Sequence, residues 1–77
     1  MKYRVYVKLA DNKFLDGYVT TETAYQLDNP KGPVKFGNRN DAREFVQDDV
    51  HAVVQELLKV AKERKWTVWH IGIEGIL

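Results

Sequence analysis

Residues Asn40–Lys65 read NDAREFVQDDVHAVVQELLKVAKERK, and this stretch decides the fold. Its apolar residues recur every three or four positions, which places them on one side of a helix with 3.6 residues per turn. The stripe consists of Ala42, Val46, Val50, Val53, Leu57 and Ala61, with Phe45, Val54, Leu58 and Val60 beside it. Polar and charged residues fill the rest of the circumference, so the pattern predicts one long amphipathic helix with a buried face.

Short polar residues mark the start and the middle of this helix. Asn40 is the predicted N-cap, because its side chain can accept a hydrogen bond from a backbone amide of the first turn, and Asn38 is the alternative. Asp48 and Asp49 would lie well inside the helix, where either could cap a second helix that begins at Val50. The sequence therefore leaves open a kink at Asp48-Asp49.

The other apolar residues are expected to reach the helix as strands. Residues 2–9 alternate polar and apolar side chains, which is typical of a half-buried strand. A short polar turn favours an antiparallel return over residues 13–20, in which Gly17 marks a bulge or a close packing contact. Residues 66–73 also alternate and predict the final strand, and residues 75–77 are expected to be an apolar tail rather than an element.

Between the hairpin and the helix, residues 23–27 and 33–36 are expected to form short strands around a tight turn. Together the elements predict a single α+β domain over residues 1–77. It would consist of a small antiparallel-dominated sheet with one long helix packed across one face. The strand residues expected to point toward the helix are Tyr3, Val5, Val7, Leu15, Val19, Trp69, Ile71 and Ile73.

Composition excludes several kinds of chemistry. The chain of 77 residues has no cysteine, so it has no disulfide framework, thiolate nucleophile or thiolate zinc site, and it has no serine nucleophile. The net charge of +1 does not favour general attraction to nucleic acid or to an acidic membrane. No apolar run approaches the roughly 20 residues that a membrane-spanning helix needs. We expect a soluble cytoplasmic protein without membrane contact.

The layout of the chain resembles small uncharacterised proteins encoded by bacteriophages and prophages of Gram-positive bacteria. The resemblance rests on residues 35–38, KFGN, followed by residues 41–45, DAREF, between an N-terminal hairpin and a β-rich C-terminus. It implies an accessory or regulatory role in an infected cell. It implies no activity and no site residues.

Two histidines are the only side chains whose ordinary pKa suits acid–base chemistry near neutral pH. His51 lies one helical turn from Asp48, and His70 shares a strand face with Glu74. Neither pair supplies the three or four converging ligands that a metal site needs, and no glycine-rich loop has phosphate-binding spacing. We therefore expect structural or solvated histidines, no catalytic residues, no metal and no cofactor.

The sheet face opposite the helix is the candidate binding surface. It combines aromatic rings with basic groups, and its residues are Arg4, Tyr6, Lys8, Phe14, Tyr18, Trp66 and His70. Such a face suits the centre of a protein–protein interface, and it also suits single-stranded nucleic acid, whose bases stack on aromatic rings. Cross-strand aromatic pairing without any partner is a third interpretation.

These observations predict a small non-enzymatic binding or regulatory protein that acts through a protein–protein contact on the sheet face, and the resemblance implies that it is phage- or prophage-encoded. The alternative is a single-stranded nucleic-acid binder that uses the same face. A core this small gains stability from further burial, and apolar groups are left over on the surface. We therefore also expect a homodimer, through the sheet face or the C-terminal strand.

Overall fold

The computed structural model describes residues 1–10, 16–29 and 31–76. In chain order its elements are strand β1 (Lys2–Leu9), strand β2 (Gly17–Tyr18), helix α1 (Thr21–Asp28), the 3₁₀ turn η2 (Arg39–Asp41), helix α2 (Gln47–Arg64) and strand β3 (Val68–Ile76). The predicted α+β class is confirmed: an antiparallel sheet carries one long helix.

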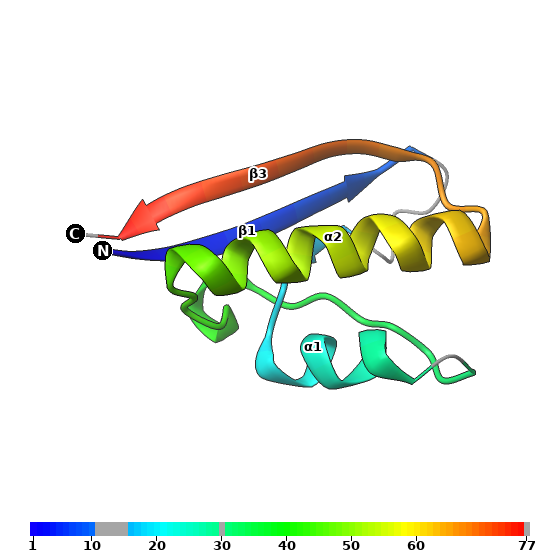
Figure 1. Ribbon diagram of the computed structural model, residues 1–77, viewed down its shortest axis with the longest axis horizontal. Helices are drawn as coiled ribbons and strands as arrows, with labels where there is room; N and C mark the ends of the chain where they lie inside the picture. The colour runs from blue at the N-terminus through cyan, green and yellow to red at the C-terminus, as the bar shows by residue number, and fades with distance from the viewer. Residues whose placement is uncertain (11–15, 30, 77) are drawn as a thin grey trace.

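Strand β1 is the centre of the sheet, whose strand order is β2-β1-β3. Both neighbours run antiparallel to β1. The pairing with β3 extends along the whole strand, from Lys2 opposite Ile76 to Leu9 opposite Val68. Figure 1 shows β1 and β3 side by side, with both ends of the chain at the same end of the molecule. The sheet is thus held mainly by segments from opposite ends of the sequence.

A β-bulge interrupts this pairing near its far end. Lys8 lies opposite His70 and Leu9 lies opposite Val68, so Trp69 is the additional residue of β3. A bulged residue loses the strict alternation of side chains between the two faces. The prediction that Trp69 points toward the helix is therefore wrong: its side chain is 69% exposed and lies beside Lys8.

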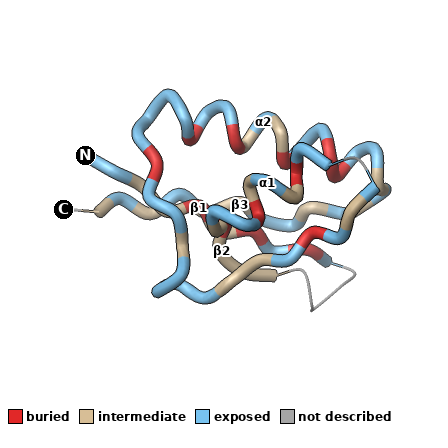
Figure 2. Tube along the Cα trace, turned by 90° about the horizontal axis from the view of Figure 1, so that it is seen from below, coloured by how far each residue is buried: buried red, intermediate tan, exposed pale blue. Residues whose placement is uncertain are grey.

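The core lies between the sheet and the two helices. Helix α2 covers one face of the sheet and α1 lies beside it, and Figure 2 shows the buried residues on the inward sides of these elements. The buried apolar residues are Val5, Val7, Leu9, Val19, Leu27, Val34, Phe45, Val50, Val53, Leu57, Val60 and Ala61. This set confirms the predicted inward positions of Val5, Val7 and Val19.

The rest of the predicted inward set differs in burial. Tyr3 and Ile71 pack, partly buried, against the core. Ile73 pairs with Val5 and so shares its face, but its side chain is 55% exposed because β3 is an edge strand. Leu15 lies outside the described residues.

Helix α2 begins at Gln47, with its N-cap at Val46, six residues later than the predicted N-cap Asn40. The preceding segment bonds to strands: Phe45 exchanges two backbone hydrogen bonds with Tyr3, each of 2.8 Å, and Ala42 forms a bridge with Thr20. These tertiary bonds outweigh the local helical periodicity. Consequently Asn40 lies in η2 and caps nothing in α2; the N-cap is Val46, which is 48% exposed.

The proposed kink at Asp48-Asp49 is also absent, because α2 is a single helix over Gln47–Arg64. Since the helix starts later, both aspartates fall in its first turn, where the positive end of the helix dipole favours them. Lys65 ends the helix in the left-handed conformation, with φ of 60°. Asn38, the alternative cap, precedes η2 and makes no side-chain capping bond.

The expected strand at residues 23–27 is instead helix α1. Thr20 caps it: its Oγ1 accepts a hydrogen bond of 3.0 Å from the amide of Thr23. Thr23 is buried, and its hydroxyl donates to the carbonyl of Lys35, which ties α1 to the following segment. Residues 33–36 form no strand, although Gly37 after them bridges to Tyr18.

The two remaining strand predictions need adjustment. Strand β2 covers Gly17–Tyr18, a small part of the predicted residues 13–20, of which residues 13–15 lie outside the described part. Strand β3 begins later than residue 66 and continues to Ile76, so Gly75 and Ile76 belong to a strand rather than a tail. Gly17 has φ of 150°, and a Cβ there would lie 2.8 Å from the Gly37 carbonyl oxygen, so the close packing contact is the correct alternative.

Candidate interaction surface

The sheet side opposite α2 is here called the open sheet face. Residues that pair across antiparallel strands lie on the same side of the sheet. The buried residues of β1 have odd numbers and face the helix, so the even-numbered residues and their partners form the open face. Its side chains are Lys2, Arg4, Tyr6 and Lys8 from β1, Tyr18 from β2, and His70, Glu74 and Ile76 from β3.

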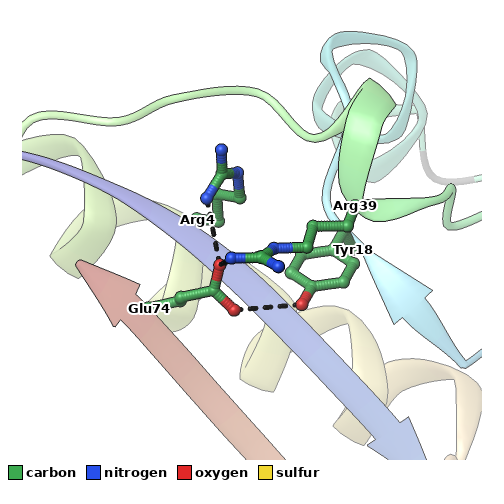
Figure 3. Close-up of polar contacts among 4 residues, drawn as sticks. All are labelled: Arg4, Tyr18, Arg39 and Glu74. Atoms are coloured by element: carbon green, nitrogen blue, oxygen red, sulfur yellow. Dashed lines mark hydrogen bonds and ion pairs between the residues drawn. The ribbon is translucent and has the colours of Figure 1, made fainter. Parts of the chain in front are cut away.

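Glu74 is the electrostatic centre of this face. Its Oε1 accepts hydrogen bonds of 3.0 Å from Arg4 Nη1 and 2.9 Å from Arg39 Nε. Its Oε2 accepts a hydrogen bond of 3.1 Å from the hydroxyl of Tyr18. Figure 3 shows the four side chains converging from β1, β2, β3 and η2. One carboxylate therefore ties the three strands together and holds η2 against the sheet.

These contacts shift two pKa values. Burial raises the pKa of Tyr18, and the hydrogen bond to the Glu74 carboxylate raises it further. For Glu74, burial acts upward, but the hydrogen bonds from Tyr18, Arg39 and Arg4 outweigh it and hold the pKa below its ordinary value. Both shifts favour the pairing of an ionised carboxylate with a neutral phenol.

Tyr6 and Tyr18 form a cross-strand aromatic pair. Their ring centroids are 5.1 Å apart and the rings are inclined by 70°, an edge-to-face arrangement. The Tyr18 hydroxyl also donates a hydrogen bond to Glu74, so the ring and the hydroxyl of Tyr18 both have partners within the protein. The pairing interpretation therefore describes these two tyrosines well.

A second group on the open face consists of Lys8, Trp69 and His70, here called the Trp69 cluster. The ammonium of Lys8 lies 4.6 Å from the centroid of the Trp69 ring, a cation–π contact. The three side chains line a shallow hollow of about 320 Å³. Gly72 beside it leaves room for the imidazole, since a Cβ there would lie 3.2 Å from His70 Nε2. The bulge thus gathers a large aromatic ring and two basic side chains at the end of the sheet.

One predicted surface residue, Trp66, is not found there, and a second is not among the described residues. Trp66 packs, partly buried, against the core, and the guanidinium of Arg64 lies 5.7 Å from the centroid of its ring. Phe14 lies outside the described residues. The structure does bring together Arg4, Tyr6 and Tyr18, and separately Lys8 with His70.

Sequence reasoning missed Trp69, Glu74 and Arg39 as members of this surface. For Glu74 the sequence does contain a signal: it is four residues from His70, so the alternation of a strand places both side chains on the same face. The bulge that moves Trp69 and the position of the η2 turn, which carries Arg39, depend on tertiary contacts and leave no local pattern.

Other chemistry-bearing groups do not converge. His51 lies exposed on α2, 3.1 Å from the side-chain nitrogen of Gln55. Among residues 1–10, 16–29 and 31–76, no group of three or more His, Asp or Glu is placed to hold a metal ion. A hollow of about 400 Å³ lies at the start of α1, lined by residues that include Glu22, Lys35 and Asp41, and it is wide open. No helix in the described part of the chain is long and apolar enough to cross a membrane.

Comparisons with protein-family models, with curated protein sequences and with solved structures find no match for this chain. The fold itself defines the class of this protein: a small α+β domain with a three-stranded antiparallel sheet in the described part of the chain. Within the described residues, two surfaces are available for a contact: the open sheet face and the edge of β3 that lies away from β1.

Proposed function

We propose that this protein is a small non-enzymatic binding protein that contacts a partner protein through the open sheet face. The observation that supports the proposal is Trp69, whose side chain is 69% exposed although its core-facing neighbours Ile71 and Val68 are partly buried. An exposed tryptophan beside basic residues is typical of the energetic centre of a protein interface. We centre the contact on the Trp69 cluster.

The charges of this face suggest the chemistry of the partner. The carboxylate of Glu74 is engaged by Arg4 and Arg39, so it adds little free negative charge to the surface. Lys8 and His70 are exposed at the other end of the strands. We therefore propose a partner segment that presents a carboxylate to Lys8 and an apolar side chain to the ring of Trp69.

Single-stranded nucleic acid is the second candidate, and the cation–π pair of Lys8 and Trp69 is what favours it: a ring for base stacking beside an ammonium for phosphate. The tyrosines speak against it, because the rings of Tyr6 and Tyr18 pack edge to face against each other. Such rings offer less free surface for successive bases. Salt distinguishes the two candidates, since phosphate contacts make log affinity fall steeply with log salt.

The decisive experiment is capture of a partner from a host lysate, with the isolated interaction measured afterwards. Trp69→Ala should weaken binding by about tenfold or more, as truncation of an interface tryptophan commonly does. Tyr25→Ala is the matched control, because Tyr25 is an equally exposed aromatic residue, 73% exposed, on α1. Equal binding by wild type and Trp69→Ala would contradict the proposal.

We also propose a phage or prophage origin and a cytoplasmic location. The resemblance described above suggests a phage or prophage source and a regulatory role in the host cell. The absence of cysteine is compatible with the reducing cytoplasm, where we place the contact. A partner identified in the capture experiment tests both points directly.

A further inference from the structure

Strand β3 is the last strand of the sheet in the described part of the chain. The sheet order β2-β1-β3 places β1 on one side of β3 and, within the described residues, no strand on the other. The strand is nine residues long, VWHIGIEGI, and Glu74 is its only charged residue. Proteins usually protect such an edge with lysine, proline or a covering segment, because its unpaired backbone groups are a template for another strand.

The pairing of β1 reveals which backbone groups of β3 point outward. Tyr3 exchanges hydrogen bonds with Phe45, and Val5 accepts one from Val19, so the odd-numbered residues of β1 bond away from β3. Backbone groups alternate sides along a strand, so the even-numbered residues of β1 bond to β3. Their partners in β3 are the even-numbered residues His70, Gly72, Glu74 and Ile76. The N–H and C=O groups of Ile71, Ile73 and Gly75 therefore face outward.

We propose that the protein forms a homodimer in which β3 pairs antiparallel with β3 of a second copy, about a two-fold axis at Ile73. In this register Ile73 pairs with Ile73 of the partner subunit, and Ile71 pairs with Gly75 of the partner subunit in both directions. All outward-facing groups of the regular segment are then satisfied, with two hydrogen bonds in each of these pairs. The edge is self-complementary, as a two-fold interface must be.

The neighbouring registers fit less well. An axis at Glu74 would place two carboxylates directly opposite each other, which is unfavourable on a sheet. An axis at Gly72 would bring the bulge at Trp69 into the pairing with Gly75 of the partner subunit. The register about Ile73 sets Glu74 opposite glycine and buries the half-exposed side chain of Ile73 against its own copy.

This pairing is independent of the proposed partner contact. A two-fold axis between antiparallel edge strands stands perpendicular to the sheet, so both α2 helices lie on one side and both open sheet faces on the other. His70 then lies opposite Ile76 of the partner subunit, whereas Lys8 and the ring of Trp69 stay accessible on the open sheet face. Trp69→Ala should therefore leave the dimer intact, and loss of the dimer should leave the Trp69 cluster in place.

Single-cysteine variants test the register, because the chain has no cysteine of its own. Paired Cα atoms lie about 5.5 Å apart, within the range that a disulfide spans. Under mild oxidation Ile73→Cys should form a covalent dimer, whereas Ile71→Cys alone should not. A mixture of Ile71→Cys with Gly75→Cys should cross-link as a heterodimer. Cross-linking of Ile71→Cys with itself and not of Ile73→Cys would overturn the register.

Sedimentation of the intact chain tests the edge itself. Ile73→Pro removes the outward N–H, whereas Ile73→Thr keeps it, so proline should raise the dimer dissociation constant about tenfold or more relative to threonine. Circular dichroism should be used to check that both variants are folded. A wild type that stays monomeric up to about 100 µM and fails to cross-link as Ile73→Cys would overturn the proposal. A dimer equally stable in Ile73→Pro and Ile73→Thr would place the contact elsewhere and also overturn it.

Discussion

Glu74 concentrates the polar contacts of the sheet in one side chain. Three donors from β1, β2 and η2 meet its carboxylate, which is 36% exposed at the side-chain level. Exposed ion pairs contribute little individually, but here a single acceptor serves two guanidinium groups and a phenol. Its replacement by a neutral residue removes the carboxylate that Arg4 and Arg39 share.

The pKa shifts of this group predict a pH dependence of stability. The pKa of Glu74 is lowered in the folded state, so its contribution is present above the unfolded value of about 4.5 and is lost as pH falls through the folded pKa. Melting temperatures should be measured from pH 3 to 7. At neutral pH the wild type should melt at a higher temperature than Glu74→Gln, and this difference in melting temperature should shrink on acidification. A constant difference across this range would contradict the role of the ionised carboxylate.

The opposite sign holds for Tyr18, whose pKa is raised above 10.0. The folded chain keeps the phenolic proton longer than the unfolded chain, so this contribution is complete below pH 10 and is lost as pH rises through the folded pKa. Tyr18→Phe should flatten the alkaline loss of stability in melts recorded from pH 8 to 11. Tyr25→Phe, an exposed control, should leave that loss unchanged.

The backbone conformation of Gly17 leads to a third prediction at the residue scale. Its φ of 150° is unfavourable for other residues, and an added Cβ would meet the Gly37 carbonyl oxygen at 2.8 Å. We expect Gly17→Ala to lower the free energy of unfolding by about 1–3 kcal/mol in urea denaturation. Gly75→Ala is the control, because its Cβ would have no neighbour nearer than 3.7 Å. Equal effects of the two substitutions would contradict the packing contact.

At the scale of elements, helix α2 starts without a capping side chain. Val46 is the N-cap residue, and a valine cannot accept a hydrogen bond from the free amides of the first turn. Val46→Ser should raise the free energy of unfolding by about 0.5–2 kcal/mol. Thermal melts would show this as a higher midpoint, while Gln47→Ser, one residue inside the helix, should give no gain. An unchanged or lower midpoint for Val46→Ser would contradict the prediction.

Substitution in the buried stripe of α2 should cause the largest loss of folding stability. Val53 is buried in the middle of the helix, so Val53→Asp places an unpaired charge in the core and should abolish the cooperative melt. Gln55→Ala removes only an exposed contact with His51 and should change the free energy of unfolding by about 0.5 kcal/mol or less. A wild-type melt for Val53→Asp would refute the assigned core face.

The sequence predicts an element correctly where its local hydrophobic periodicity favours the same secondary structure as its tertiary contacts. The alternation of β1 and the stripe from Val50 to Ala61 were sufficient to place the core and the α+β class. Residues 40–46 have helical periodicity but bond to β1 and to Thr20, and α1 is too short for its periodicity to stand out. On the candidate surface, parity placed Arg4, Tyr6 and Lys8 correctly, whereas a bulge, which no local pattern marks, decided the position of Trp69.

At the scale of the whole molecule, the main strand pairing joins residues far apart in sequence. Partners in β1 and β3 are separated by between 59 residues, for Leu9 with Val68, and 74 residues, for Lys2 with Ile76. A long loop must close before these contacts form, and such topologies fold slowly for their size.

We therefore expect refolding of the chain from urea on the millisecond-to-second timescale rather than in microseconds. Stopped-flow fluorescence of the two tryptophans measures the rate. Val7→Ala, in the central strand, should accelerate unfolding if the β1–β3 pairing forms late. Refolding complete within the mixing dead time would contradict this picture.

The same pairing determines how the domain responds to a pulling force. The start of β1 lies beside the end of β3, so tension applied at the two ends of the described chain enters at the pair Lys2–Ile76. The inter-strand hydrogen bonds are then loaded one pair after another along their own direction, instead of all together in shear. Mechanically the domain is a zipper that opens from its terminal end. A tether attached through both ends would give way at low tension, while one attached at one end and at the β-bulge would pull along the strands and hold longer.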